Sequence, residues 1–149
     1  MRGQKKMRLR NYILTLLTLS TLTIYGQQIK KCDETIYHSI SKNIGKLTQK
    51  EITDFLLTFG QECRNNVEFS EWSNELLFKI LDKQTELTLK TIEKEEKRID
   101  KEIILEDLEE PISYTPDFKK LITKIEGIKM NDSLKKEIIK RLKTADEKD

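Results

Sequence analysis

Residues 32–63 read CDETIYHSISKNIGKLTQKEITDFLLTFGQEC, and they carry the clearest signals of helix start and helix end in the sequence. Asp33 is placed to cap a first helix, and a capping box formed by Thr48 and Glu51 begins a second one. Each helix has apolar residues at helical spacing, followed by a glycine that can end it. In the first helix these are Ile36, Ile40 and Ile44, followed by Gly45. In the second they are Ile52, Phe55, Leu56 and Phe59, followed by Gly60. The pattern predicts two antiparallel helices of about 12 residues each, joined by a three-residue turn.

Cys32 precedes the first of these helices and Cys63 follows the second, so an antiparallel pair brings both cysteines to the same open end. They are the only cysteines, and an even number in an exported protein is typical of a disulfide. The bridge would close a loop of about 30 residues, which corresponds to about 3–4 kcal/mol in the chain-entropy model. A metal or redox pair is less favoured, because the spacing is not C-x-x-C and His38 is the only histidine. We therefore predict a Cys32–Cys63 disulfide, no metal site and no cofactor.

The start of the chain has the three parts of a secretory signal, because a basic segment is followed by an apolar run from Tyr12 to Tyr25 and a small residue. The run is about 14 residues long and rich in Ser and Thr, whereas a membrane span needs about 20 apolar residues. We therefore expect residues 1–26 to be a cleaved signal peptide, and retention as a membrane anchor is the alternative. Lys30 and Lys31 directly before Cys32 argue against a lipid-modified cysteine.

The formal charge of +2 misrepresents the mature protein, because the leader carries five basic residues and no acidic one. Without the leader, 23 basic residues stand against 26 acidic ones, a net charge of −3. A chain with this balance has no global attraction to nucleic acid or to anionic lipid. We expect no nucleic-acid partner and no stable membrane insertion after cleavage, with localisation in the periplasm or outside the cell.

Helical periodicity continues through the rest of the chain, and no segment alternates like a strand for long. Ser70 is expected to cap the third helix, and the pattern leaves open whether residues 70–97 form one helix or two with a break near Gln84. Helix ends are expected at Pro111 and at Gly127. Helix starts are expected at Thr115-Pro116 and at Asn131 or Asp132. We predict an all-α fold of about six helices over residues 27–144, as a compact bundle or a short stack of helical hairpins. A polar, frayed tail is expected at residues 145–149.

Three polar features are better explained as solvated surfaces than as sites. His38 points partly away from the apolar face of the first helix, which indicates a lone surface histidine. The acids Glu93, Glu95, Glu96, Asp100, Glu102, Glu106, Asp107, Glu109 and Glu110 alternate with basic residues at helical offsets, such as Glu93 with Lys97. The basic residues Lys135, Lys136, Lys140, Arg141 and Lys143 fit the polar side of an ordinary amphipathic helix.

One region is a candidate interaction site. Trp72 is the only tryptophan, and with Phe69 and the Asn65-Asn66 loop it has the composition of a recognition surface. Packing of these aromatic residues in the core is the competing interpretation. If the chain has a binding site, we predict it at Asn65, Asn66, Phe69 and Trp72.

No phosphate loop, dinucleotide fingerprint, nucleophile elbow or metal-binding helix motif is present, so we expect no catalytic residues and no enzyme. The favoured function is an exported, non-catalytic binding protein that recognises a protein partner or another envelope component. An inhibitor-like or immunity-like role fits this class. The alternatives are a small carboxylate-dependent envelope hydrolase and, if the leader is retained, a membrane-tethered structural protein. The sequence leaves the oligomeric state open.

Overall fold

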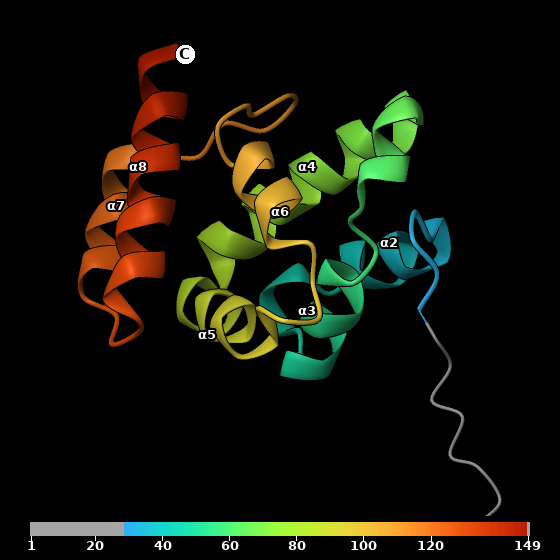
Figure 1. Ribbon diagram of the computed structural model, residues 1–149, viewed down its shortest axis with the longest axis horizontal. Coiled ribbons are helices and arrows are strands. Elements are labelled where there is room, and N and C mark those ends of the chain that lie inside the picture. The colour runs from blue at the N-terminus through green and yellow to red at the C-terminus, as the bar shows by residue number, and fades with distance from the viewer. Residues whose placement is uncertain (1–28, 149) are drawn as a thin grey trace, which may run out of the picture.

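The computed structural model describes residues 29–148, so the leader expected at residues 1–26 lies outside the described residues (Figure 1). This part of the chain forms seven α-helices and two short 3-10 helices and contains no strand. In chain order they are α2 (Glu34–Ser41), η1 (Ile44–Lys46), α3 (Gln49–Leu56), η2 (Gln61–Asn65), α4 (Val67–Lys83), α5 (Thr85–Glu95), α6 (Lys101–Asp107), α7 (Phe118–Glu126) and α8 (Asp132–Lys148). The predicted all-α fold is confirmed.

The first two helices are shorter than the sequence predicted, at eight residues each. α2 ends at Ser41, after which the N–H of Asn43 donates to the carbonyl of Ile40 at 3.0 Å. The chain then forms η1, whose i→i+3 bonds are tighter than those of an α-helix. Asn43 and Gly45 are weak helix formers, which explains why the first helix does not continue to Gly45.

The predicted caps of both helices are present. The Asp33 carboxylate accepts the N–H of Thr35 at the start of α2. At the start of α3, the Thr48 hydroxyl accepts the N–H of Glu51 while the Glu51 carboxylate accepts the N–H of Thr48. This reciprocal pair satisfies two backbone donors that the helix end would otherwise leave free.

The predicted disulfide joins Cys32 and Cys63, whose Cα atoms lie 5.5 Å apart. Cys32 has a positive φ of 58°, which turns the chain into α2, and its N–H donates to the carbonyl of Thr58 at 2.9 Å. Cys63 is buried in η2, directly before α4. The bridge therefore ties the segment before α2 to the segment before α4.

The open question about residues 70–97 is answered by two helices with a break at Gln84. The Gln84 side chain accepts the N–H of Leu47 at 2.7 Å and donates to the carbonyl of Leu47 at 2.9 Å. These two bonds hold the α4–α5 corner against the turn before α3. α4 starts at Val67, capped by Asn66, so the expected cap at Ser70 is wrong and Ser70 lies inside the helix.

The last two helices also begin and end differently from the expectation. α7 starts at Phe118 with Asp117 as its cap, so Pro116 precedes the helix instead of beginning it. Asn131 caps α8 by accepting the N–H of Leu134 at 3.1 Å. α8 continues through Lys148 with Ala145 buried, which corrects the frayed tail expected after Thr144 for the residues described.

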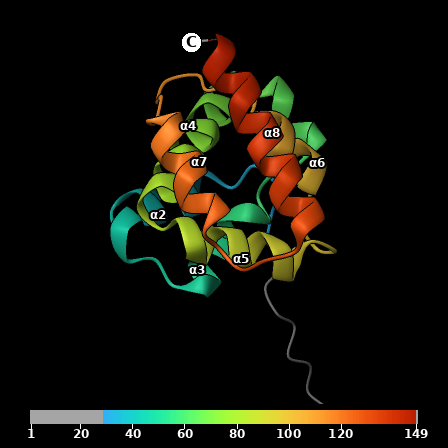
Figure 2. The same cartoon turned by 90° about the vertical axis from the view of Figure 1, so that its left-hand side faces the viewer.

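The helices pack around one core, to which every α-helix of the described chain contributes a buried side chain. α3 and α4 pack against α5, and α2 packs against α3 and α4. α7 and α8 form a hairpin along one side of the molecule, where α7 contacts α5 and α8 contacts α6 (Figures 1 and 2). The result is a compact bundle in which the α7–α8 hairpin lies at the opposite end from α2.

Candidate binding surface

Three aromatic side chains from α2 and α4 meet at the surface, and we call Tyr37, His38 and Trp72 the aromatic cluster. The Tyr37 and Trp72 rings are stacked, with centroids 5.3 Å apart and planes inclined by 19°. The His38 ring centroid lies 5.4 Å from that of Tyr37 and 5.9 Å from that of Trp72. His38 is exposed, and the other two residues are partly exposed. The cluster thus offers aromatic area to solvent in a fixed arrangement.

Buried neighbours on each helix set the position of the cluster. Tyr37 precedes the buried Ile40 by three residues, and Trp72 follows the buried Phe69 by three residues. Side chains three apart on a helix are neighbours, so each ring lies at the edge of a face that packs into the core. Because α2 packs against α4, the two edges meet and the rings stack.

The structure separates the four residues predicted to bind. Trp72 joins the aromatic cluster. Phe69 is only 2% exposed and packs inside the protein, so the expectation that it lines a surface is corrected. Asn66 is exposed, but its side-chain oxygen accepts the N–H of Phe69 at 3.1 Å and caps α4. Asn65 is exposed at the end of η2.

Sequence reasoning missed Tyr37 and treated His38 as a lone surface residue. The available signal was the position of Tyr37 three residues from a core isoleucine, where a large aromatic ring is only half covered. Nothing local indicated that Trp72, 35 residues further along the chain, would cover it.

Carboxylates lie beside the aromatic cluster on both helices. Glu34 is one turn before His38 on α2, and Glu68 and Glu71 lie on α4 within one turn of Trp72. All three are exposed, and none forms an ion pair with another residue of the described chain. Three carboxylates without an ion pair therefore lie near the rings, while Lys30 and Lys31 share a hollow with Glu34.

A second feature is a pocket of about 350 Å³ between α4, α6 and the segment that follows α6. Its walls are formed by Arg64, Ser70, Asn74, Glu106, Asp107, Glu109, Glu110 and Ile112. Burial raises the pKa of Asp107 to about 6, and the nearby Arg64 guanidinium offsets part of this effect. A carboxyl that titrates near neutrality inside a pocket is a recognised property of functional sites.

Asn74 holds this pocket together from inside α4. Its amide nitrogen donates to the carbonyls of Asp107 at 2.9 Å and Glu110 at 3.0 Å. Its oxygen accepts the N–H of Ile112 at 3.0 Å. The residue is 2% exposed, so these bonds replace water for all three backbone groups.

Most of the nine acids grouped by the sequence analysis have other partners. Glu93 accepts the N–H of Asn131 at 2.6 Å instead of pairing with Lys97. Ion pairs with Lys or Arg are formed by Glu95, Glu96, Glu102, Glu106, Glu109 and Glu110. Two members depart from a solvated helix face: Glu95, which is buried and paired with Arg98, and Asp107, whose carboxyl lies in the pocket.

The basic residues of the last helix lie on α8, where Arg141 pairs with Glu109 of the preceding segment at 2.8 Å. Lys136, Lys140 and Lys143 line a groove of about 550 Å³ between α7 and α8. Glu126 and Glu147 share this groove, so its charge is mixed.

A hollow of about 1160 Å³ lies where the described chain begins and is lined by residues that include Lys31, Asp33, Lys50 and Asp54. Its acids are already engaged, because Asp33 caps α2 and Asp54 pairs with Lys50 at 2.5 Å. We therefore give more weight to the aromatic cluster and to the Asp107 pocket.

Comparison with protein-family models, with curated proteins and with solved structures finds no significant match. Within residues 29–148, no cluster of His, Cys, Asp and Glu has the geometry to hold a metal ion. None of the helices in that range is both long and apolar enough to cross a membrane.

Proposed function

We propose that this chain is an exported, non-catalytic binding protein of the periplasm or the cell exterior. It recognises a protein partner or another envelope component through the surface where α2 meets α4. The observation that carries the proposal is the aromatic cluster, in which the Tyr37 and Trp72 rings are stacked 5.3 Å apart and remain partly open to solvent. Rigid aromatic side chains contribute large contact area at low entropic cost, and they dominate binding energies at interfaces.

Two features support export. The first 26 residues have the pattern of a secretory signal, and the Cys32–Cys63 disulfide is of a kind that persists in oxidising compartments and is rare in the cytosol. An inhibitor-like or immunity-like role lies within this class of function.

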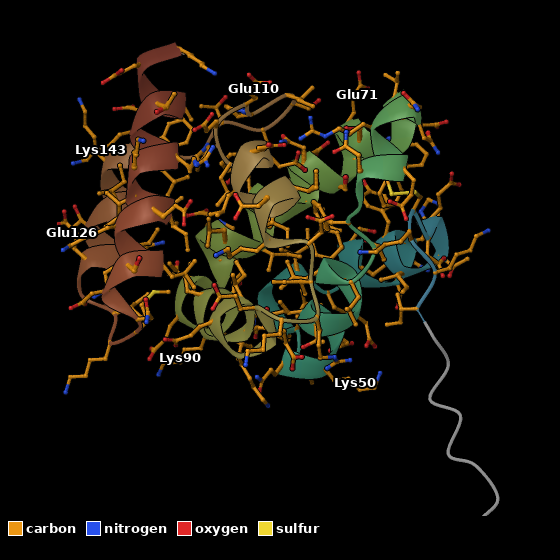
Figure 3. The ribbon with its side chains drawn as sticks, viewed as in Figure 1. Lys50, Glu71, Lys90, Glu110, Glu126 and Lys143 are labelled. Atoms are coloured by element: carbon orange, nitrogen blue, oxygen red, sulfur yellow. A yellow bond between two sulfur atoms is a disulfide. The ribbon has the colours of Figure 1, made fainter. Side chains whose placement is uncertain are left out.

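The binding role is tested by chemical crosslinking in envelope extract. The oxidised wild-type protein is compared with Trp72→Ala and with Lys90→Ala, a matched surface change on α5 (Figure 3). We expect one stoichiometric partner that wild type and Lys90→Ala capture and that Trp72→Ala does not. Circular dichroism checks that the variants are folded. Capture that is unaffected by Trp72→Ala, or turnover of an envelope substrate by the purified protein, would refute the proposal.

One observation keeps a carboxylate-dependent hydrolase as a second candidate. The raised pKa of Asp107, about 6, is the property that a general acid needs near neutral pH. The Glu106, Glu109 and Glu110 carboxylates in the same pocket are candidates for the second carboxylate of such a site. Assays on envelope polymers should show activity that Asp107→Asn abolishes if this second candidate is correct. No activity in either protein would remove it.

A membrane-tethered structural protein differs from the main proposal only in the fate of the leader. Cell fractionation with mass measurement of the intact chain separates the two. The main proposal requires a processed chain that is free of the membrane.

A further inference from the structure

We propose that the aromatic cluster binds a guanidinium group, so that the partner is a protein that presents an exposed arginine-rich segment. This inference rests on the proposed function and names the chemistry of its partner. Two observations support it, which are the ring geometry and the charge around the rings.

The ring geometry suits a planar cation. A cation is attracted to an aromatic face within about 6 Å of the ring centroid, and tryptophan is the strongest of these acceptors. The Tyr37 and Trp72 rings stack on each other, so a guanidinium would lie on an outer face of the pair, and the His38 centroid is 5.4 Å and 5.9 Å from theirs. The chain contains a contact of this kind elsewhere, because the Lys79 ammonium lies 5.7 Å from the Tyr114 ring centroid.

The charge around the rings favours a cation over an anion. Glu34, Glu68 and Glu71 are exposed and have no ion-pair partner in the described part of the chain. Glu34 and Glu68 lie in the first turns of α2 and α4, where each helix end contributes about half a positive charge. Two full carboxylates outweigh two such half charges, and Glu71 adds a third. The opposing charges are Lys42, directly after α2, and Lys30 and Lys31, which share a hollow with Glu34, so Glu68 and Glu71 on α4 contribute most of the negative charge.

Arginine fits these features better than lysine does. Its guanidinium is planar, stacks on aromatic faces and presents several N–H donors in one plane. One guanidinium can therefore lie on a ring of the aromatic cluster while its edge donates to Glu68, which is four residues before Trp72 on the same face of α4. The ammonium of lysine is a compact, strongly hydrated charge that does not make both contacts at once.

The chain supplies two spectroscopic probes for a test, because Trp72 is its only tryptophan and His38 its only histidine. The oxidised protein, purified from an exporting host, is titrated with an arginine hexapeptide, a lysine hexapeptide and a glutamine hexapeptide. We expect the arginine peptide to change Trp72 fluorescence and the His38 ring signals in NMR spectra. The lysine peptide should bind more weakly, and the glutamine peptide should leave both signals unchanged. Raising the salt from about 0.05 M to about 0.5 M should weaken arginine binding, because exposed charges are then screened.

Variants separate the rings from general charge effects. Tyr37→Leu keeps the Trp72 reporter, and we expect it to weaken arginine-peptide binding about twofold to fivefold. Glu68→Gln should weaken it by a similar factor, about twofold to fivefold, through loss of one exposed ion pair. Glu126→Gln is the matched control, because Glu126 is also an exposed glutamate without an ion-pair partner in residues 29–148 but lies at the far end of the molecule (Figure 3). The control should bind as the wild type does.

Three results would overturn the inference. They are no response of either probe to the arginine peptide, equal weakening by Glu68→Gln and Glu126→Gln, and a Trp72 response to peptidoglycan fragments but not to the arginine peptide. The last result would assign the surface to carbohydrate. If crosslinking still captures a partner that depends on Trp72, these outcomes reject the arginine preference and leave the proposed function standing.

Discussion

Replacing Asp107 by asparagine should stabilise the protein at neutral and alkaline pH. The side chain is mostly buried beside α4, and burial raises its pKa from the ordinary 3.8 to about 6. Between these two pH values the folded state binds more protons at this site than the unfolded state does. The folded state is therefore favoured at low pH, and this contribution is lost as the pH rises through 6.

The size of the effect follows from the two pKa values. The interval from 3.8 to about 6, at about 1.4 kcal/mol for each pKa unit, corresponds to about 3 kcal/mol. Asparagine has nearly the same shape and never carries the charge. The stability difference between Asp107→Asn and wild type should therefore shift in favour of the variant by about 3 kcal/mol between pH 4 and pH 8.

Urea unfolding, followed by circular dichroism at several pH values, measures this difference. Glu102→Gln on the same helix is the control, because Glu102 is exposed and its charge stays in water. A difference between Asp107→Asn and wild type that does not change with pH would refute the argument. It would mean that the carboxyl is solvated in the folded protein.

Three other changes should each lower the free energy of unfolding by an amount that depends on the hydrogen bonds or the bridge removed. The urea midpoint, at constant m-value, measures each loss. Asn74→Ala leaves the carbonyl of Glu110 and the N–H of Ile112 without their partner, removes one of two bonds to the carbonyl of Asp107, and should cost about 2–4 kcal/mol. Ser73→Ala, a buried neighbour with one hydrogen bond, should cost under about 1 kcal/mol. Equal effects of these two changes would contradict the role of Asn74. Replacing Cys32 and Cys63 together by serine should cost about 3–4 kcal/mol, and a loss below about 1 kcal/mol would show that the bridge constrains little. Asn66→Ala should cost about 1 kcal/mol as a lost helix cap, and no loss would show that Asn66 does not cap α4 in solution.

Local signals in the sequence predicted much of the helical hairpin. Asp33, Thr48 and Glu51 cap α2 and α3 as expected, because a capping side chain bonds to backbone only two or three residues away. The disulfide followed from the same information, since two antiparallel helices bring their outer ends together. Features that depend on neighbours in sequence could therefore be predicted.

Helix boundaries that depend on contacts between distant parts of the chain could not be fixed from the sequence. The sequence suggested a break near Gln84 but did not decide whether it exists, because the Gln84 side chain bonds to Leu47, 37 residues earlier, and no local pattern marks that contact. The start of α4 was placed too late because the apolar spacing used for the prediction begins at Trp72, whereas the first residues of the helix, Val67 and Glu68, are exposed. Asn66 and Ser70 both have capping side chains, and the apolar pattern favoured the wrong one.

The same limit applies to the two candidate sites. The sequence marked Trp72 as an unusual residue, but its contact with Tyr37 depends on how α2 packs against α4. Asp107 was grouped with eight other acids, since its burial depends on a pocket wall that Asn74 holds in place from α4. The sequence shows which residues are aromatic or acidic. Tertiary packing sets how far each side chain is buried and which groups surround it.

The disulfide restrains the two helices that carry the aromatic cluster. Cys32 lies directly before α2, which carries Tyr37, and Cys63 lies shortly before α4, which carries Trp72. The bridge fixes the ends of both helices next to each other, so it limits how far the two rings can separate. Reduction removes that limit while the core contacts of α2 and α4 remain, and we expect ligand binding by the aromatic cluster to weaken before the helices unfold.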